Sequence, residues 1–255
     1  MFSGSPGKDG LCECEGCKLI FVGSPPSRTA LAAERNKRFT GAWRGAHDSK
    51  VRGETEAAAE IMAGYFAHTQ NRRAVLNAFD RNVLDAACGL GFRLREFQRY
   101  GWYVYGLDPS AEAAEYAQAC FLDVRQGWID EGASPDRTYD LVLFAGGFGG
   151  IPDPVEAIKR LQKILRPGGL VFVSIGGDPI SATLFHYSGE SLRRLFMENG
   201  FQVLEEGEAE GKPFAWFARK KDARAPKAKV AAEAETEMKP EKKVEPEAAA
   251  VVKEA

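Results

Sequence analysis

The stretch NVLDAACGLG, residues 82–91, decides the fold class. It starts as a short apolar run, which is typical of a buried strand, and ends in a turn that holds Gly89 and Gly91. Glycine lets the backbone turn tightly and pass close to a ligand. Asp85 stands where the apolar run ends. A buried strand followed by a glycine turn and a helical pattern indicates the first unit of a parallel α/β sheet.

Similar apolar runs alternate with helical patterns as far as residue 220. The expected strands cover 82–87, 102–108, 121–126, 139–145, 170–176, 201–207 and 213–220, and the expected helices cover 56–79, 92–100, 110–119, 154–165 and 188–199. This alternation predicts a parallel sheet with helices on both faces. No helix separates the last two strands, which indicates a hairpin. We therefore predict a Rossmann-like, doubly wound α/β fold whose seven-stranded sheet is mostly parallel, with one antiparallel strand in the C-terminal hairpin.

Composition divides the chain into three regions. Residues 1–55 are irregular and contain a cysteine cluster, whereas residues 56–220 carry the α/β pattern. Residues 221–255 are mostly Ala, Lys, Glu and Pro and hold no aromatic residue. We expect this tail to be disordered, because it has too little apolar surface to offset the entropy lost on ordering.

Charge and hydropathy narrow the classes of function. The formal net charge is −2, so no basic excess favours a nucleic acid or a bilayer surface as partner. No stretch approaches the roughly 18 apolar residues that a membrane helix needs. Residues 1–10 lack the apolar centre of a signal peptide. We therefore expect a cytoplasmic protein with reduced cysteines.

The ends of the first two strands carry the candidate binding residues, because ligands of doubly wound sheets bind there. A dinucleotide fingerprint that starts at Gly89 fails, since its third glycine position is Leu94, and no P-loop lysine follows. Asp108 ends the second strand, and its two carboxylate oxygens suit the two hydroxyls of a ribose. A pyrophosphate needs bare N–H groups at a helix start. A cationic sulfonium ligand, in contrast, tolerates a carboxylate such as Asp85.

Five segments in order resemble the motifs of class I S-adenosylmethionine-dependent methyltransferases. They are VLDAACGLG (83–91), YGLDPS (105–110), YDLVLFA (139–145), LRPGGLVFVSI (165–175) and SGESLRRLFMENGFQVLE (188–205). The chain is most similar to the small-molecule branch that includes the ubiquinone-biosynthesis-like enzymes. The resemblance covers about residues 56–220. It implies S-adenosylmethionine as the cofactor and a small-molecule acceptor that is methylated at O, N or C.

The same resemblance implies which residues bind the cofactor. The residues are Asp85, Ala87, Gly89, Gly91, Asp108, Pro109, Gly127, Trp128, Ile129, Ala145 and Gly146. In this order they would contact the methionine part of the cofactor, then its ribose, its adenine and finally the transferred methyl group. Trp128 stands where the family often has an acidic residue that binds adenine. Either the indole contacts the adenine, or Asp130 reaches it instead.

Candidates for the acceptor site are few. The resemblance implies that His186 faces the acceptor pocket, as a catalytic base or a substrate contact; the alternative is a loop histidine bonded to backbone. Tyr187 and Tyr65 are further candidate substrate contacts. A general base is required only when the acceptor loses a proton.

The glycine-rich loop FAGGFGGIPDP, residues 144–154, follows the fourth strand. Many relatives carry glutamate and histidine where Gly149 and Gly150 stand here. We therefore expect a roomier acceptor site with Phe148 as its apolar wall. Replacing both glycines with glutamate and histidine would then impair acceptor use more than cofactor binding.

The cysteines at 12, 14 and 17 precede the apolar run KLIFV, residues 18–22. A C-x2-C knuckle followed by a strand is half of a zinc ribbon, and some members of this branch carry such a ribbon at the N-terminus. Two interpretations stay open. Either Cys12, Cys14 and Cys17 bind zinc with a fourth ligand such as His47, or the ribbon is degenerate and its cysteines are reduced.

Two other functions stay open as well. The chain could hold the cofactor without transferring a methyl group, because no base is evident. An NAD-dependent oxidoreductase is the second alternative. It is disfavoured because Leu94 occupies the third glycine position of the dinucleotide-binding fingerprint.

Overall fold

The computed structural model of this chain describes residues 4–6, 10–39, 47–70, 81–134, 137–176, 180–209 and 211–220. They belong to one compact unit, Met1–Lys221. The expected disordered tail, 221–255, lies outside the described residues, as does the end of the first expected helix, 71–79. The division of the chain into three regions therefore stays a prediction.

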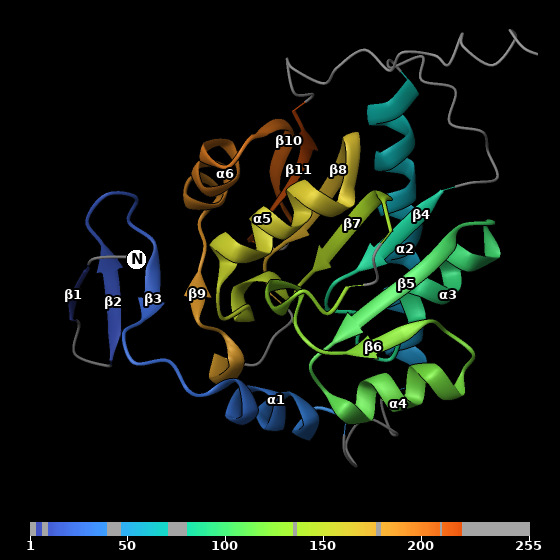
Figure 1. Cartoon of the computed structure of the whole chain (residues 1–255), viewed down its shortest axis with the longest axis horizontal. Helices are drawn as coiled ribbons and strands as arrows, with labels where there is room; N and C mark the ends of the chain where they lie inside the picture. The colour runs from blue at the N-terminus through green and yellow to red at the C-terminus, as the bar shows by residue number, and fades with distance from the viewer. Residues whose placement is uncertain are drawn as a thin grey trace, which may run out of the picture. The chain divides into compact units, whose positions relative to one another are not determined.

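A seven-stranded sheet forms the centre of the fold, in the order β10–β11–β8–β7–β4–β5–β6 (Figure 1). Its strands are β4 (Asn82–Asp85), β5 (Tyr103–Asp108), β6 (Val124–Gln126), β7 (Tyr139–Ala145), β8 (Leu165–Ser174), β10 (Phe201–Ala209) and β11 (Lys212–Arg219). Strands β4 to β8 pair in parallel, whereas β11 is antiparallel to both β8 and β10. The predicted sheet and its single antiparallel strand are confirmed.

Helices cover both faces of this sheet (Figure 1). They are α1 (Arg28–Lys37), α2 (His47–Gln70), α3 (Phe92–Arg99), α4 (Ala111–Ala119), α5 (Pro154–Ile164) and α6 (Gly189–Glu198). One core cluster packs α5 and α6 against the sheet, and a second packs α2, α3 and α4. Side-chain oxygens of Ser110, Asp153 and Ser188 cap the starts of α4, α5 and α6. Within the described ranges, no helix is long and apolar enough to cross a membrane.

A second, four-stranded sheet has the order β1–β2–β3–β9. Its strands are β1 (Gly4–Pro6), β2 (Leu11–Cys14), β3 (Ile20–Val22) and β9 (Phe185–His186). Strand β9 lies between β8 and α6 in the chain and pairs with β3 through Ile20 and His186. This pairing ties the N-terminal strands to the segment that follows β8. Neither this sheet nor α1 was predicted from the sequence.

Candidate functional site

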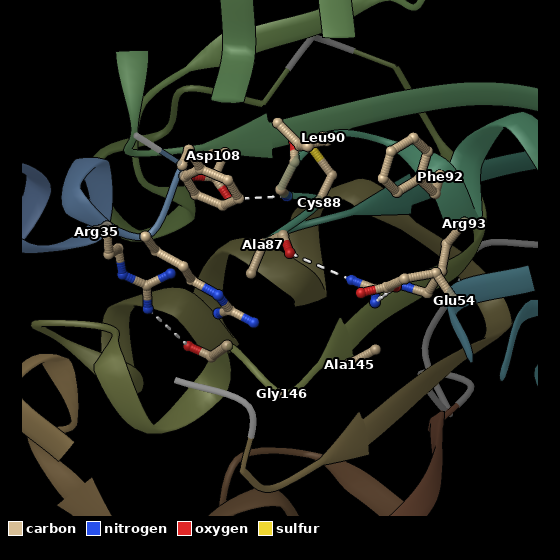
Figure 2. Close-up of a pocket in the computed structure, with 14 residues that line it drawn as sticks. Arg35, Glu54, Ala87, Cys88, Leu90, Phe92, Arg93, Asp108, Ala145 and Gly146 are labelled. Atoms are coloured by element: carbon tan, nitrogen blue, oxygen red, sulfur yellow. Dashed lines mark hydrogen bonds and ion pairs between the residues drawn. The ribbon is translucent and has the colours of Figure 1, made fainter. Parts of the chain in front are cut away.

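A hollow opens where β4, β5 and β7 end (Figure 2). The parallel strands bring their carboxyl ends to one edge of the sheet, so loops far apart in sequence meet there. Five residues of the predicted cofactor site line the hollow: Ala87, Gly89, Asp108, Ala145 and Gly146. The sequence-based prediction of a site at this edge therefore coincides with a concave site in the structure.

Backbone groups hold the Asp108 carboxylate in place. Its Oδ2 accepts a hydrogen bond from the N–H of Gly89, and its Oδ1 accepts one from the N–H of Ser110, both at 2.9 Å. The side chain is almost fully buried, and this burial raises the pKa of Asp108 above its ordinary value, while nearby Arg35 acts against the rise. Each oxygen keeps acceptor capacity beyond these bonds. The carboxylate is thus a fixed acceptor for hydroxyl groups in the hollow.

The two glycines after β4, Gly89 and Gly91, have different structural roles. Both adopt positive φ, +54° at Gly89 and +79° at Gly91, which other residues rarely do. A Cβ on Gly91 would lie 2.5 Å from a methyl carbon of Leu122, so Gly91 allows the loop to pack tightly. A Cβ on Gly89 would face the ring of Phe39 at 3.5 Å, at the hollow itself. Gly89 therefore leaves room on the side where a ligand would lie.

We expect the substitution Gly147→Ala to disturb the site. A Cβ on Gly147 would lie 2.1 Å from the Cβ of Ala87, so the loops after β4 and β7 must separate. The variant should lose about 1–3 kcal/mol of unfolding free energy, as overpacked sites do, and should bind cofactor more weakly. Chemical denaturation and calorimetry measure both effects. Gly189→Ala is the matched control, because nothing lies within 4 Å of the added Cβ; equal effects in both variants would contradict the close approach.

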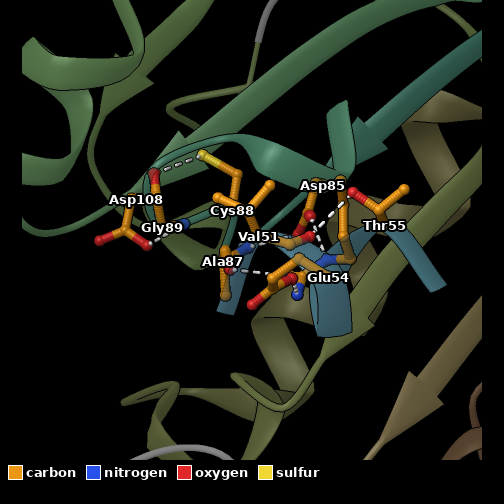
Figure 3. A network of polar contacts seen from close by, with 9 residues as sticks. Val51, Glu54, Thr55, Asp85, Ala87, Cys88, Gly89 and Asp108 are labelled. Carbon is orange, nitrogen blue, oxygen red and sulfur yellow. Dashed lines mark hydrogen bonds and ion pairs between the residues drawn. The ribbon is translucent and has the colours of Figure 1, made fainter. Parts of the chain in front are cut away.

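A buried ion network lies behind the loop that follows β4 (Figure 3). Asp85 is fully buried and accepts a hydrogen bond from Arg93 Nε at 2.9 Å and a longer one from the N–H of Ala87. Arg93 also pairs with Glu54 of α2. Burial alone would lower the pKa of Arg93, but the two carboxylates raise it overall. Ala87, Glu54 and Arg93 line the hollow, whereas Asp85 supports the loop from behind.

Arg35 lies next to the residues predicted to flank the adenine. Its guanidinium carbon is 5.2 Å from the centre of the buried Trp128 ring, and its Nη2 donates to the carbonyl of Gly147 at 3.5 Å. Arg35 lines the hollow (Figure 2), while Gly127, Trp128, Ile129 and Pro109 do not. The indole therefore contributes to this side of the site through a cation–π contact.

Asp130 has another role than the one considered from the sequence. Its oxygens accept hydrogen bonds from two guanidinium nitrogens of Arg28, at 3.1 and 2.6 Å, and from the N–H of Asp153 at 3.0 Å. The Asp130 carboxylate is thus engaged by Arg28 and Asp153, and its contact with adenine stays a prediction. The ion pair instead fastens the start of α1 to the loop after β6.

Sequence reasoning missed the residues that α1 and α2 bring to the hollow. They are Arg35, Arg38, Phe39 and Glu54, together with Arg93 of α3. The sequence pattern for α1 was weak, because Leu31 is the only fully buried apolar residue of this helix. The cap residue Ser27 was the one other sign of a helix start. One apolar residue does not make a helical periodicity.

The predicted acceptor contacts do not line the hollow. Tyr65 is fully buried in an edge-to-face contact with Trp102 and lies eleven residues beyond Glu54, which is about 16 Å along a helix. Tyr187 is buried against Phe148. His186 is half-buried in β9 and pairs with β3. In the described parts of the chain, no histidine lines the hollow.

The expectation of a roomier loop after β7 is wrong. Phe148 is fully buried and packs against Phe144 and Phe196 rather than forming a pocket wall. The N–H of Leu184 donates to the carbonyl of Gly149 at 2.9 Å, and a Cβ on Gly149 would lie 2.8 Å from a backbone oxygen of β9. Strand β9 therefore fills the space. Glutamate and histidine in this loop would displace backbone, so their effect would not be limited to the acceptor.

The three N-terminal cysteines are free thiols, each half-buried. Among the residues that the structure describes, no group of three or more His, Cys, Asp or Glu side chains is placed to hold a metal ion. The zinc site considered from the sequence is thus not assembled from Cys12, Cys14 and Cys17. The fourth ligand suggested for it, His47, has no described side chain.

Comparisons with known sequences agree with this picture. A family model described as a methyltransferase domain matches residues 58–186, just over half of the chain. A ubiquinone biosynthesis O-methyltransferase of Vibrio cholerae is 31% identical over 128 residues, which are 47% of this chain and 52% of that protein. The same-named enzyme of Serratia proteamaculans is 35% identical over 104 residues, 38% and 43% of the two chains. The chain thus spans about half the length of the curated relatives it matches.

Solved structures share the fold. Magnesium protoporphyrin IX methyltransferase of Synechocystis PCC 6803, with bound S-adenosylmethionine, has a TM-score of 0.58 at 18% identity and covers 77% of this chain and 98% of its own. A didemethyltoxoflavin N1-methyltransferase of Burkholderia thailandensis, with its substrate and S-adenosylhomocysteine, has a TM-score of 0.57 at 18% identity and covers 86% and 100%. At this identity the likeness establishes the architecture.

Proposed function

The chain belongs to the methyltransferase domain family, and from this premise we propose that it transfers a methyl group from S-adenosylmethionine to a small-molecule acceptor. The predicted family, fold and cofactor class are confirmed. The acceptor and the residue roles are proposals. The observation that carries the proposal is the hollow at the ends of β4, β5 and β7, with the fixed Asp108 carboxylate in its wall.

The chemistry of the lining fits the cofactor. Asp108 offers acceptors for the ribose hydroxyls, and its position is set by two backbone N–H groups. The side-chain-free surface of Gly89 allows close approach to the ligand. Arg38 lines the same hollow, and a guanidinium group binds a carboxylate such as that of a methionine strongly. Trp128 supports the adenine side through its contact with Arg35.

Bound S-adenosylmethionine supplies a methyl group on a positively charged sulfur. The protein's own contribution is to align the methyl donor with the acceptor and to enclose both, because a displacement at an activated methyl carbon gains most from positioning. Ala145 and Gly146, on the lining after β7, would run behind the reacting centre. The ion pair of Arg28 with Asp130 holds α1 at the edge of the sheet, where Arg35 reaches the hollow.

We propose oxygen as the acceptor atom to test first. The support is the name of the curated relatives, which are O-methyltransferases. His186, the predicted base, does not line the hollow. We therefore expect acceptors whose hydroxyl group ionises readily, such as phenols, to react better than aliphatic alcohols.

A two-step experiment tests this function. Calorimetry of the full-length protein with S-adenosylmethionine, S-adenosylhomocysteine and NAD establishes the cofactor, and binding of both sulfur compounds but not of NAD is expected. A turnover assay with a library of hydroxyl, amine and carbon acceptors then separates transfer from binding alone. Binding of NAD alone would overturn the assignment. Cofactor binding without turnover for any acceptor class would favour a protein that holds the cofactor without methyl transfer.

Cofactor affinity should fall as the pH is lowered. The ionised form of Asp108 accepts hydroxyl hydrogen bonds, whereas a protonated carboxyl loses one acceptor. Burial raises the pKa of Asp108, so affinity is complete above this raised pKa and is lost as the pH falls through it. Calorimetry across mildly acidic pH measures the change, with circular dichroism as a control for folding. An affinity that stays constant while the protein remains folded would contradict this role.

A further inference from the structure

A second site lies away from the cofactor hollow, at the turn between β2 and β3. The N–H of Lys18 donates to the carbonyl of Cys14 at 2.9 Å, and the N–H of Cys14 donates to the carbonyl of Leu19 at 2.8 Å. Lys18 adopts φ of +59°, which closes the turn. The two thiols of the C-x2-C segment, Cys14 and Cys17, lie on the lining of one hollow.

The surroundings make the two thiols unequal. The backbone N–H of Cys17, and then that of Gly16, hydrogen-bond to the sulfur of Cys14 and lower the pKa of its thiol. Arg194 of α6 adds a positive charge, and its guanidinium donates to the carbonyl of Gly16 at 2.5 Å. Burial raises the pKa of the Cys17 thiol. An activated thiol beside a second, less acidic one is the arrangement of a redox pair.

A buried hydroxyl next to Cys17 also lacks a partner. Tyr187 is 5% exposed, and its hydroxyl has no hydrogen bond among the described residues. Burial, followed by the nearby Cys17 thiol, raises the pKa of Tyr187. A buried polar group without a partner costs folding free energy. The hydroxyl lies within the electrostatic influence of Cys17.

The site is open to small molecules. An open hollow is lined by both cysteines together with Ser191, Arg194 and Glu198. A metal ion is disfavoured here, because the guanidinium of Arg194 repels a cation and no third ligand joins the two sulfurs in the described structure. Cationic and N–H groups around a thiol instead favour thiolate chemistry.

We propose that Cys14 and Cys17 form a redox-active dithiol–disulfide pair that exchanges with low-molecular-weight disulfides. The Cys14 thiolate attacks one sulfur of such a disulfide and releases one thiol, which leaves a mixed disulfide. Cys17 then gives up its proton and attacks the sulfur of Cys14, which releases the second thiol. The net reaction converts the protein dithiol and one small disulfide into a protein disulfide and two small thiols. The protein dithiol donates two electrons to the small disulfide, so no other reactant is required.

The test uses the full-length protein in a series of glutathione redox buffers. Free thiols are blocked by alkylation after equilibration, and peptides are identified by mass spectrometry. We expect one transition, in which Cys14 and Cys17 become linked while Cys12 stays free. Cys14 should be alkylated about tenfold faster than Cys12 at neutral pH. In Cys17→Ser, the glutathione adduct should persist on Cys14.

Two controls make the result decisive. Cys12→Ser is the matched variant, because Cys12 lies two residues before Cys14 in the same strand, and its redox transition should equal that of the parent protein. The reduced protein is also incubated with zinc alone and desalted. Retention of zinc by Cys14 and Cys17 would overturn the proposal in favour of a metal site. Absence of the Cys14–Cys17 disulfide in every buffer, or equal alkylation of Cys12 and Cys14, would overturn it as well.

Discussion

Replacing Asp108 with asparagine is expected to weaken the binding of S-adenosylmethionine about a hundredfold, or ~3 kcal/mol. The two carboxylate oxygens accept hydrogen bonds from the N–H groups of Gly89 and Ser110. An asparagine side chain has only one oxygen, so its NH₂ group must face one of these donors. The variant thus loses an acceptor for the ribose and leaves a backbone N–H unpaired. Calorimetry with the parent and variant proteins measures the difference.

Asp140→Asn is the matched control for this experiment. Asp140 is also a buried aspartate; it accepts hydrogen bonds from the N–H of Asn82 at 2.8 Å and from Arg166 at 2.9 Å. It lies near the start of β7, at the opposite edge of the sheet from the hollow. The control should lose stability but keep its cofactor affinity. Equal losses of affinity in both variants would mean that Asp108 acts through folding and does not bind the cofactor.

Replacing Arg93 with methionine is expected to cost about 3–5 kcal/mol of unfolding free energy. Methionine fills similar space but leaves the fully buried Asp85 and the partly buried Glu54 without their cation. An unpaired buried carboxylate is strongly destabilising, because it has lost its hydration without compensation. The melting temperature should fall by roughly 10 °C. Urea denaturation and calorimetry both measure this loss.

Two further variants separate the charge effect from a helix effect. Arg95→Met changes an exposed arginine of the same helix and should alter stability by no more than about 0.5 kcal/mol. Adding Asp85→Asn to Arg93→Met should recover part of the loss, because it removes the unpaired charge. If Arg93→Met costs no more than Arg95→Met, the ion network does not support the loop after β4.

The central sheet was predictable because its signal is local. Each strand is a nearly continuous apolar run, and serine, aspartate or glycine marks the neighbouring helix ends. Helix α1 and the four-stranded sheet depend on distant partners instead. Arg28 pairs with Asp130, 102 residues away, and β3 pairs with the two-residue strand β9. Such contacts leave no periodicity in the sequence.

The residues of the candidate site were also predictable only in part. Gly89 and Asp108 were predicted because strand ends in a doubly wound sheet are known from the strand pattern. The roles of aromatic residues were not predictable, since a phenylalanine such as Phe148 suits a pocket wall and a core equally well. Only the packing of β9 against the loop after β7 shows that Phe148 belongs to the core. Arg35 reaches the hollow from a helix that the sequence did not reveal.

Titration of the purified full-length protein with S-adenosylhomocysteine tests the cofactor site most directly. We predict saturable binding of one molecule per chain, displacement by S-adenosylmethionine, affinity about a hundredfold lower in Asp108→Asn, and unchanged affinity in Asp140→Asn. Absence of saturable binding to the folded protein, or full affinity in Asp108→Asn, would contradict a cofactor site at the ends of β4, β5 and β7.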